Sequence, residues 1–64
     1  MREEKRKFRD RIRLELAKTG AIKLADNLNV SHSNVLRWSD GVNLPHPIIM
    51  KSIVEFLDNQ GEAV

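Results

Sequence analysis

Four side chains within a short stretch have the chemistry to recognise the edges of DNA bases. A helix over this stretch would turn all four outward; they are His32, Ser33, Leu36 and Arg37. A guanidinium can pair with two acceptors on guanine, imidazole and hydroxyl groups can donate or accept, and a leucine can contact a thymine methyl group. The same pattern also fits an exposed polar helix face that binds nothing, so the surrounding elements must decide.

The sequence contains no arrangement of residues that is typical of a catalytic site. Ser31, His32 and Ser33 are adjacent, and adjacency does not place a hydroxyl group on an imidazole that a carboxylate holds. His32 and His46 make a poor metal-ligand set, because the chain has no cysteine. A glycine-rich loop that would cradle phosphates is also missing. We therefore expect no enzymatic activity, no cofactor and no metal site.

Two short helices joined by a tight turn are predicted around the four side chains, over 21–28 and 31–39. Apolar residues recur on one face of each helix; they are Leu24, Ala25, Leu28, Val35 and Trp38. Asn29 follows the first helix, where the backbone usually becomes left-handed, and asparagine accepts that conformation better than any residue but glycine. The Ser31 hydroxyl can cap the second helix.

Two further helices, over 4–19 and 47–58, are predicted to cover this pair. Their apolar stripes consist of Phe8, Ile12 and Leu16, and of Met50, Ile53, Val54 and Leu57. Gly20 is suited to end the first helix, and Pro47 to begin the last. In the loop, Gly41 ends the preceding helix and Leu44 is expected in the core. The fold class is therefore all-α, a compact four-helix bundle forming one domain over 1–64, with a mobile tail at 59–64.

The central segment resembles the Cro/repressor class of helix-turn-helix proteins from temperate phages and bacteria. The resemblance covers roughly residues 8–57 and rests on Ala25, Leu28, Val30, Ser31, Val35, Trp38, Gly41, Leu44 and Pro45. Phage Cro proteins and lambda-type CII activators also share the spacing of Gly20, Lys23 and Ala25. The resemblance implies a lambda repressor-like fold whose second central helix enters the DNA major groove. It implies base contacts by His32, Ser33, Leu36 and Arg37.

Phosphate contacts are expected from residues that flank this helix. Residues 1–39 carry ten Lys/Arg against five Asp/Glu, so the net charge of +2 conceals a basic half. The charged segment 1–7 is either a solvated helix start or a basic arm along the DNA backbone. The expected phosphate contacts are Lys5, Arg6, Lys7, Ala21 through its amide, Lys23, Ser31, Asn34 and Asn43, with His46 a further candidate in the loop.

Several positions depart from the family pattern. Many relatives carry a glutamate after the tryptophan, paired with an arginine on the first helix. Here Ser39 and Leu14 stand at those positions, so both partners are expected to be missing together. A glutamine that braces a phosphate in many relatives is Ala21 here, and the turn glycine is Asn29. No room is expected for the fifth helix that several repressors use to dimerise, so a dimer geometry does not carry over.

We expect a sequence-specific transcription regulator of phage or mobile-element type that binds double-stranded DNA, represses or contacts RNA polymerase, and acts in the bacterial cytoplasm. It is expected to form a homodimer, because Ile49 and Phe56 lie at the edge of the last apolar stripe; the alternative is their contact with Phe8. No membrane span is expected, since no apolar run approaches roughly 18 residues. The alternative function is a protein-binding helix-turn-helix module, such as an antirepressor or a small subunit of a larger complex. RNA binding is a weaker option, because aromatic residues are few.

Overall fold

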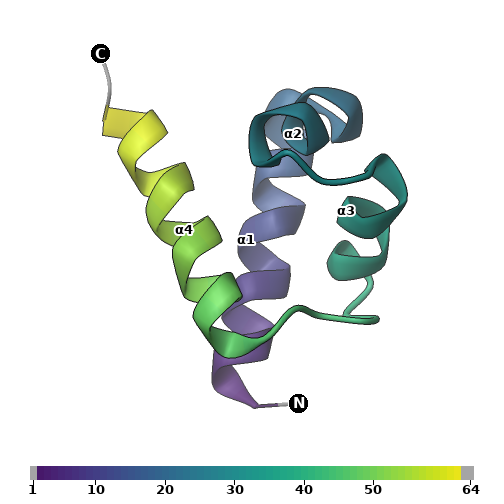
Figure 1. The fold of residues 1–64 in the computed structure, drawn as a ribbon, viewed down its shortest axis with the longest axis vertical. Coiled ribbons are helices and arrows are strands. Elements are labelled where there is room, and N and C mark those ends of the chain that lie inside the picture. Colours follow the sequence, from purple (N-terminus) through teal and green to yellow (C-terminus); the bar gives the residue numbers. More distant parts are fainter. Residues whose placement is uncertain (1, 63–64) are drawn as a thin grey trace.

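The computed structural model describes residues 2–62, and within that range it contains four α-helices and no strand. In chain order these are α1 (Glu3–Thr19), α2 (Ala21–Leu28), α3 (His32–Ser39) and α4 (Pro47–Glu62). Figure 1 shows α1 in the middle of the molecule, with α4 on one side and the α2–α3 pair on the other. The predicted all-α fold with four helices is confirmed. Met1 of the predicted arm and residues 63–64 of the predicted tail lie outside the described residues.

A single residue, Gly20, separates α1 from α2. Its φ of 91° lies in a region that residues with a Cβ atom rarely adopt. The Gly20 amide donates to the Leu16 carbonyl (3.0 Å), and the Gly20 carbonyl accepts from the Leu24 amide (3.1 Å). One glycine therefore closes α1 and opens α2.

The turn between α2 and α3 has the conformation predicted from its residues. Asn29 is left-handed, with φ 56° and ψ 44°, and the amides of Asn29 and Val30 donate to carbonyls in the last turn of α2. The Ser31 side-chain oxygen accepts from the Asn34 amide (3.2 Å) and caps α3. Both local predictions are confirmed, and the angle between the two helices is set within three residues.

Asn29→Gly is expected to leave the free energy of unfolding unchanged or slightly higher, because glycine adopts the left-handed conformation without a Cβ penalty. Urea denaturation followed by circular dichroism measures the difference. A loss of more than about 1 kcal/mol would show that the Asn29 side chain has another role, since relief of strain has the opposite sign.

Each helix contributes two residues to the buried core. These residues are Phe8, Ile12, Leu24, Ala25, Val35, Trp38, Met50 and Leu57. Partly buried apolar residues pack against them, namely Leu16, Leu28, Val30, Leu44, Ile53 and Val54. The rings of Phe8 and Trp38 meet edge to face, with centroids 5.6 Å apart, and connect α1 to α3. The predicted apolar stripes are confirmed as the faces that pack together.

The C-terminal end of α3 is bonded to α1 through a contact that was not predicted. Arg13 Nε donates to the Ser39 carbonyl (2.7 Å), and the Ser39 hydroxyl donates to the Leu36 carbonyl (2.7 Å). Leu14 is exposed and plays no part in this link. The acceptor is a backbone carbonyl, so the link requires no acidic side chain at Ser39, and the arginine next to Leu14 reaches it.

The loop after α3 is shaped by two residues with positive φ. Gly41 has φ 79°, and its amide donates to the Trp38 carbonyl (3.0 Å), so it ends α3 as predicted. Asn43 has φ 51°, which was not predicted, and its carbonyl accepts from Trp38 Nε1 (3.2 Å). The Trp38 indole therefore satisfies its one donor while its ring stays buried. Leu44 is half-buried against the core, in line with its expected place.

The start of α4 is capped by a histidine. Pro47 is the first helical residue, as predicted, and His46 Nδ1 accepts from the Ile48 amide (3.2 Å). The amide of Met50 donates to the His46 carbonyl (2.9 Å). His46, a candidate phosphate contact in the sequence, therefore has a structural role in starting the last helix.

The end of α4 differs from the prediction. The helix continues to Glu62 instead of ending at 58, so residues 59–62 of the predicted tail are helical. Arg11 donates to the Asp58 carboxylate, and this hydrogen bond raises the pKa of the Arg11 guanidinium above its ordinary value. Asp58 is thereby fixed to α1, and nothing in the two residues that follow it stops a helix. None of the helices in the described residues is long and apolar enough to cross a membrane.

Candidate nucleic-acid interface

The outward face of α3 brings together the four predicted base-contact residues. All four are exposed; they are His32, Ser33, Leu36 and Arg37. The rotation of the helix is fixed, because Val35 and Trp38 are buried on its other side. The Arg37 side chain has no hydrogen bond or ion pair with any other residue in 2–62. This face therefore presents a free guanidinium beside an imidazole, a hydroxyl and a leucine that is 42% exposed.

The N-terminal end of α2 offers backbone amides and a lysine. Gly20 precedes the helix and has no side chain to cap it, so the first amides of α2, including that of Ala21, have no side-chain partner. A helix start with free amides attracts phosphate through those groups and the helix dipole. Lys23 is exposed in the same turn. These groups have the chemistry of one phosphate contact.

Three other predicted phosphate contacts already have structural roles. Ser31 uses its oxygen to accept from the Asn34 amide, and its hydroxyl proton remains available to a ligand. Asn43 uses its carbonyl for Trp38. The side chains of Ser31, Asn34 and Asn43 are all exposed, so their outer groups can still reach a ligand.

The three basic residues near the N-terminus do not share one face. Lys5, Arg6 and Lys7 belong to the first turns of α1 and are exposed. Arg6 and Lys7 both lie near Glu3 Oε1, at 3.5 and 3.8 Å. Lys7 also lines a groove toward α4. The segment is therefore helical from Glu3 onward, and its charges spread around the helix.

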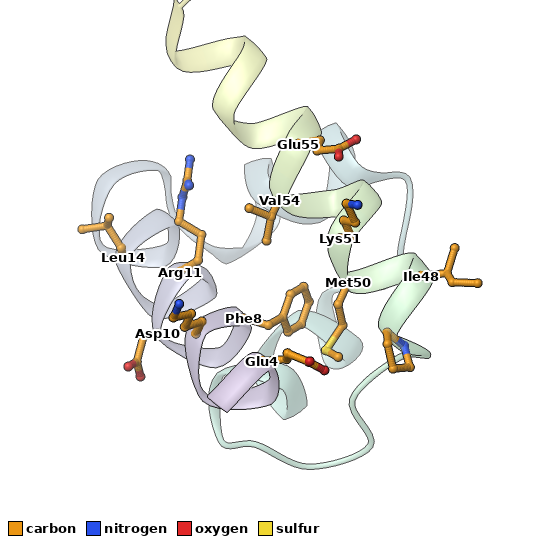
Figure 2. A pocket seen from close by; sticks show the side chains of 12 residues that line it. Glu4, Phe8, Asp10, Arg11, Leu14, Ile48, Met50, Lys51, Val54 and Glu55 are labelled. Atoms are coloured by element: carbon orange, nitrogen blue, oxygen red, sulfur yellow. The ribbon is translucent and has the colours of Figure 1, made fainter. Parts of the chain in front are cut away.

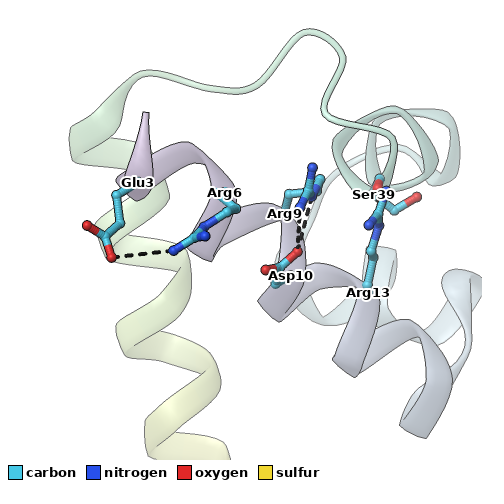
Figure 3. A network of polar contacts seen from close by, with 6 residues as sticks. All are labelled: Glu3, Arg6, Arg9, Asp10, Arg13 and Ser39. Carbon is cyan, nitrogen blue, oxygen red and sulfur yellow. Dashed lines mark hydrogen bonds and ion pairs between the residues drawn. The ribbon is translucent and has the colours of Figure 1, made fainter. Parts of the chain in front are cut away.

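A different set of basic residues does share a face of α1, and sequence reasoning missed it. These are Arg6, Arg9 and Arg13 of α1 together with Arg2, the residue that precedes the helix, and they recur at intervals of four, three and four residues. Figure 3 shows Arg6, Arg9 and Arg13 following one another along the helix, with Arg13 beneath Ser39. The spacing is visible in the sequence, but only the packing of α1 shows that this face borders the end of α3.

An apolar groove of about 930 Å³ lies between α1 and α4 (Figure 2). Phe8, Met50 and Val54 contribute to its apolar lining. Charged side chains of both signs surround them; they are Glu4, Lys7, Asp10, Arg11, Lys51 and Glu55. Because α4 and α3 lie on opposite sides of α1 (Figure 1), the groove is separate from the outward face of α3.

A second, smaller hollow of about 280 Å³ contains the two residues predicted for a dimer interface. Ile49 and Phe56 are 50% and 39% exposed, and they line it together with Asn27 and Leu28 of α2. Phe8, the alternative partner in the sequence interpretation, lines the groove on the other side of α4. Ile49 and Phe56 are therefore apolar side chains that are partly exposed to solvent.

No protein-family model, no curated protein and no solved structure matches this chain. What the protein does is therefore inferred from its own residues and their geometry. The features that bear on function are the outward face of α3, the uncapped start of α2, the arginines of α1 and the free apolar surface of α4.

Proposed function

We propose that this protein is a sequence-specific, DNA-binding transcription regulator, with α2 and α3 forming a helix-turn-helix of the Cro/repressor kind. The observation that carries the proposal is the unpaired, exposed Arg37 on a helix whose opposite face is buried. An arginine of this kind can form a bidentate pair with guanine, which is the commonest specific contact in the major groove. His32, Ser33 and Leu36 would read neighbouring bases from the same face.

The other groups would position α3 on the duplex without reading sequence. The start of α2, with Ala21 and Lys23, would hold a phosphate on one side of the groove, and Ser31, Asn34 and Asn43 would contact the backbone near α3. Repression would follow if the bound site overlapped a promoter. Activation would require a contact with RNA polymerase from a site beside the promoter.

Selection of binding sites from a random pool of duplex DNA tests this proposal. The expected result is a shared motif of a few base pairs, with a guanine that becomes dispensable when Arg37 is replaced. A pool that shows no enrichment after several rounds contradicts it. The protein-binding alternative predicts in addition that affinity for any duplex is low and falls little with salt, whereas DNA binding falls steeply as salt rises.

We further propose that the protein binds its site as a homodimer through Ile49 and Phe56 of α4. Two copies of α3 would then lie about 34 Å apart, one turn of DNA. Ile49→Glu is expected to raise the dimer dissociation constant by at least roughly tenfold, because a charge would be buried without a partner. Sedimentation equilibrium measures this constant.

Ile48→Glu is the matched control for this prediction. Ile48 is 71% exposed and lies on the other side of α4, at the α1–α4 groove, so the dimer should be unaffected. A protein that stays monomeric at high concentration and binds a non-palindromic half-site one-to-one would rule out the dimer. If only Ile48→Glu dissociates the dimer, the interface lies at the α1–α4 groove instead.

A further inference from the structure

We propose that the arginine stripe of α1, defined as Arg2, Arg6, Arg9 and Arg13, binds the phosphate backbone of DNA beside the groove that α3 occupies. The proposal rests on the proposed function in one respect, namely that DNA is the ligand of α3. It adds a contact surface on a helix that takes no part in the helix-turn-helix unit.

The position of the stripe is set by its contact with α3. Arg13 donates to the Ser39 carbonyl at the last residue of α3, and Arg9 and Arg6 continue from there toward the N-terminus of α1 (Figure 3). Arg2 is the residue that precedes α1. Two other basic residues of α1, Lys7 and Arg11, face α4 instead, since both line the groove and Arg11 is bonded to Asp58. The stripe is therefore the basic face of α1 that lies on the α3 side.

The acidic neighbours of the stripe do not neutralise it. Glu3 lies 3.5 Å from Arg6, and Asp10 lies 3.0 Å from Arg9. The Glu3 and Arg6 side chains are 67% and 56% exposed, and pairs of this kind contribute at most about 1 kcal/mol. A guanidinium has five donors, so Arg9 can keep its partners within the protein and still donate to a phosphate. Arg6 can thus exchange a weak ion pair for a stronger one, while Arg9 adds a phosphate contact to the bonds that it already makes.

The shape of the stripe indicates a repeating polyanion. Its residues span about 16 Å along α1, at 1.5 Å per residue. A DNA strand presents one phosphate per nucleotide in a regular row, and arginine pairs with phosphate through two hydrogen bonds. A single small anion would need guanidinium groups that converge on one point, whereas these follow one another along a line. The backbone of a duplex that holds α3 in its groove meets this requirement.

Two double variants that remove the same charge from different faces of the protein test the proposal. Arg2→Gln/Arg6→Gln removes two positive charges from the stripe, and Lys18→Gln/Lys51→Gln removes two from other faces of α1 and α4. All four side chains are exposed, so both proteins should fold, which helicity checks. Lys18 follows Arg11 by seven residues and therefore lies on the same side of α1 as Arg11, away from the stripe.

The measurement is the affinity for a preferred and a scrambled labelled duplex over a series of salt concentrations. The stripe variant is expected to weaken both duplexes equally and to flatten the plot of log affinity against log salt by about 1.8, which is 0.9 for each lost phosphate contact. The Lys18→Gln/Lys51→Gln variant should keep the slope of the natural protein. Equal slopes for the two variants would mean that only net charge matters, and an unchanged slope in the stripe variant would mean that α1 is not on DNA; either result overturns the proposal.

The same data separate this proposal from the proposed function. Suppose that the natural protein distinguishes the two duplexes but the salt dependence of the stripe variant is unchanged. The proposed function is then supported, and the proposal that the stripe binds DNA is contradicted. Suppose instead that the natural protein binds both duplexes equally and that only the stripe variant has a flatter salt dependence. The stripe then binds DNA, and the proposal of sequence-specific regulation is contradicted. A parallel titration with a single-stranded RNA of equal length completes the test, since tighter binding of RNA than of either duplex would overturn the assignment to DNA.

Discussion

Replacing Arg37 with alanine is expected to weaken binding to the preferred DNA site by about 1–3 kcal/mol, or roughly 5- to 150-fold. The reason is the loss of a bidentate pair with one guanine, made by a side chain that has no partner within residues 2–62. Preference at one base pair of the site should relax, while binding to scrambled DNA should change little. Affinities of the variant for the preferred, singly substituted and scrambled duplexes measure all three effects.

The position of Arg37 makes this variant a clean probe of function. The side chain is exposed and outside the core, so Arg37→Ala should fold normally, with helicity and urea stability close to those of the natural protein. Lys51→Ala, which removes an exposed charge from α4, is the matched control and should leave the base preference intact. If Arg37→Ala weakens both preferred and scrambled duplexes equally, α3 is not reading bases. If it changes neither, this face is not on DNA, and the protein-binding alternative moves ahead.

Trp38→Ala is expected to lower the free energy of unfolding by about 3–5 kcal/mol, the usual cost of removing a large buried aromatic side chain. Trp38 is 6% exposed, meets the Phe8 ring edge to face, and donates to the Asn43 carbonyl. A domain of this size has a total stability of only about 3–10 kcal/mol. The variant should therefore lose between about a third and all of its stability, and it should bind DNA only to the extent that it stays folded.

Urea denaturation followed by circular dichroism checks this result, since tryptophan fluorescence is lost with the side chain. Trp38→Phe keeps an aromatic ring against Phe8 and removes the hydrogen bond to Asn43, whose carbonyl can turn to water. Its cost should be smaller, with about 1 kcal/mol for the lost hydrogen bond. Arg37→Ala, one residue away on the outer face of α3, should change stability by less than about 0.5 kcal/mol. A similar small effect for Trp38→Ala would mean that the indole does not hold α1 to α3.

The turns and the core of this protein follow from local features of its sequence. Asn29 and Ser31 predict the left-handed turn and the cap of α3, because their preferences depend on their own side chains and the backbone within three or four residues. Gly20 predicts the end of α1 for the same reason. The periodic apolar residues predict which side of each helix is buried, since a helix repeats its faces every 3.6 residues whatever it packs against.

The contacts between helices were decided by the tertiary structure. Leu14 and Ser39 gave no reason to expect a link between α1 and α3, yet Arg13 bonds to the Ser39 backbone carbonyl, a group that every residue carries. Lys7 and Arg6 are adjacent in sequence and alike in charge, yet only Lys7 lines the α1–α4 groove. Periodicity shows which residues share a side of a helix, but which neighbouring helix that side meets depends on how all four helices pack. The hydrogen bond between Arg11 and Asp58 near the end of α4 is a second example, because it joins residues far apart in the chain.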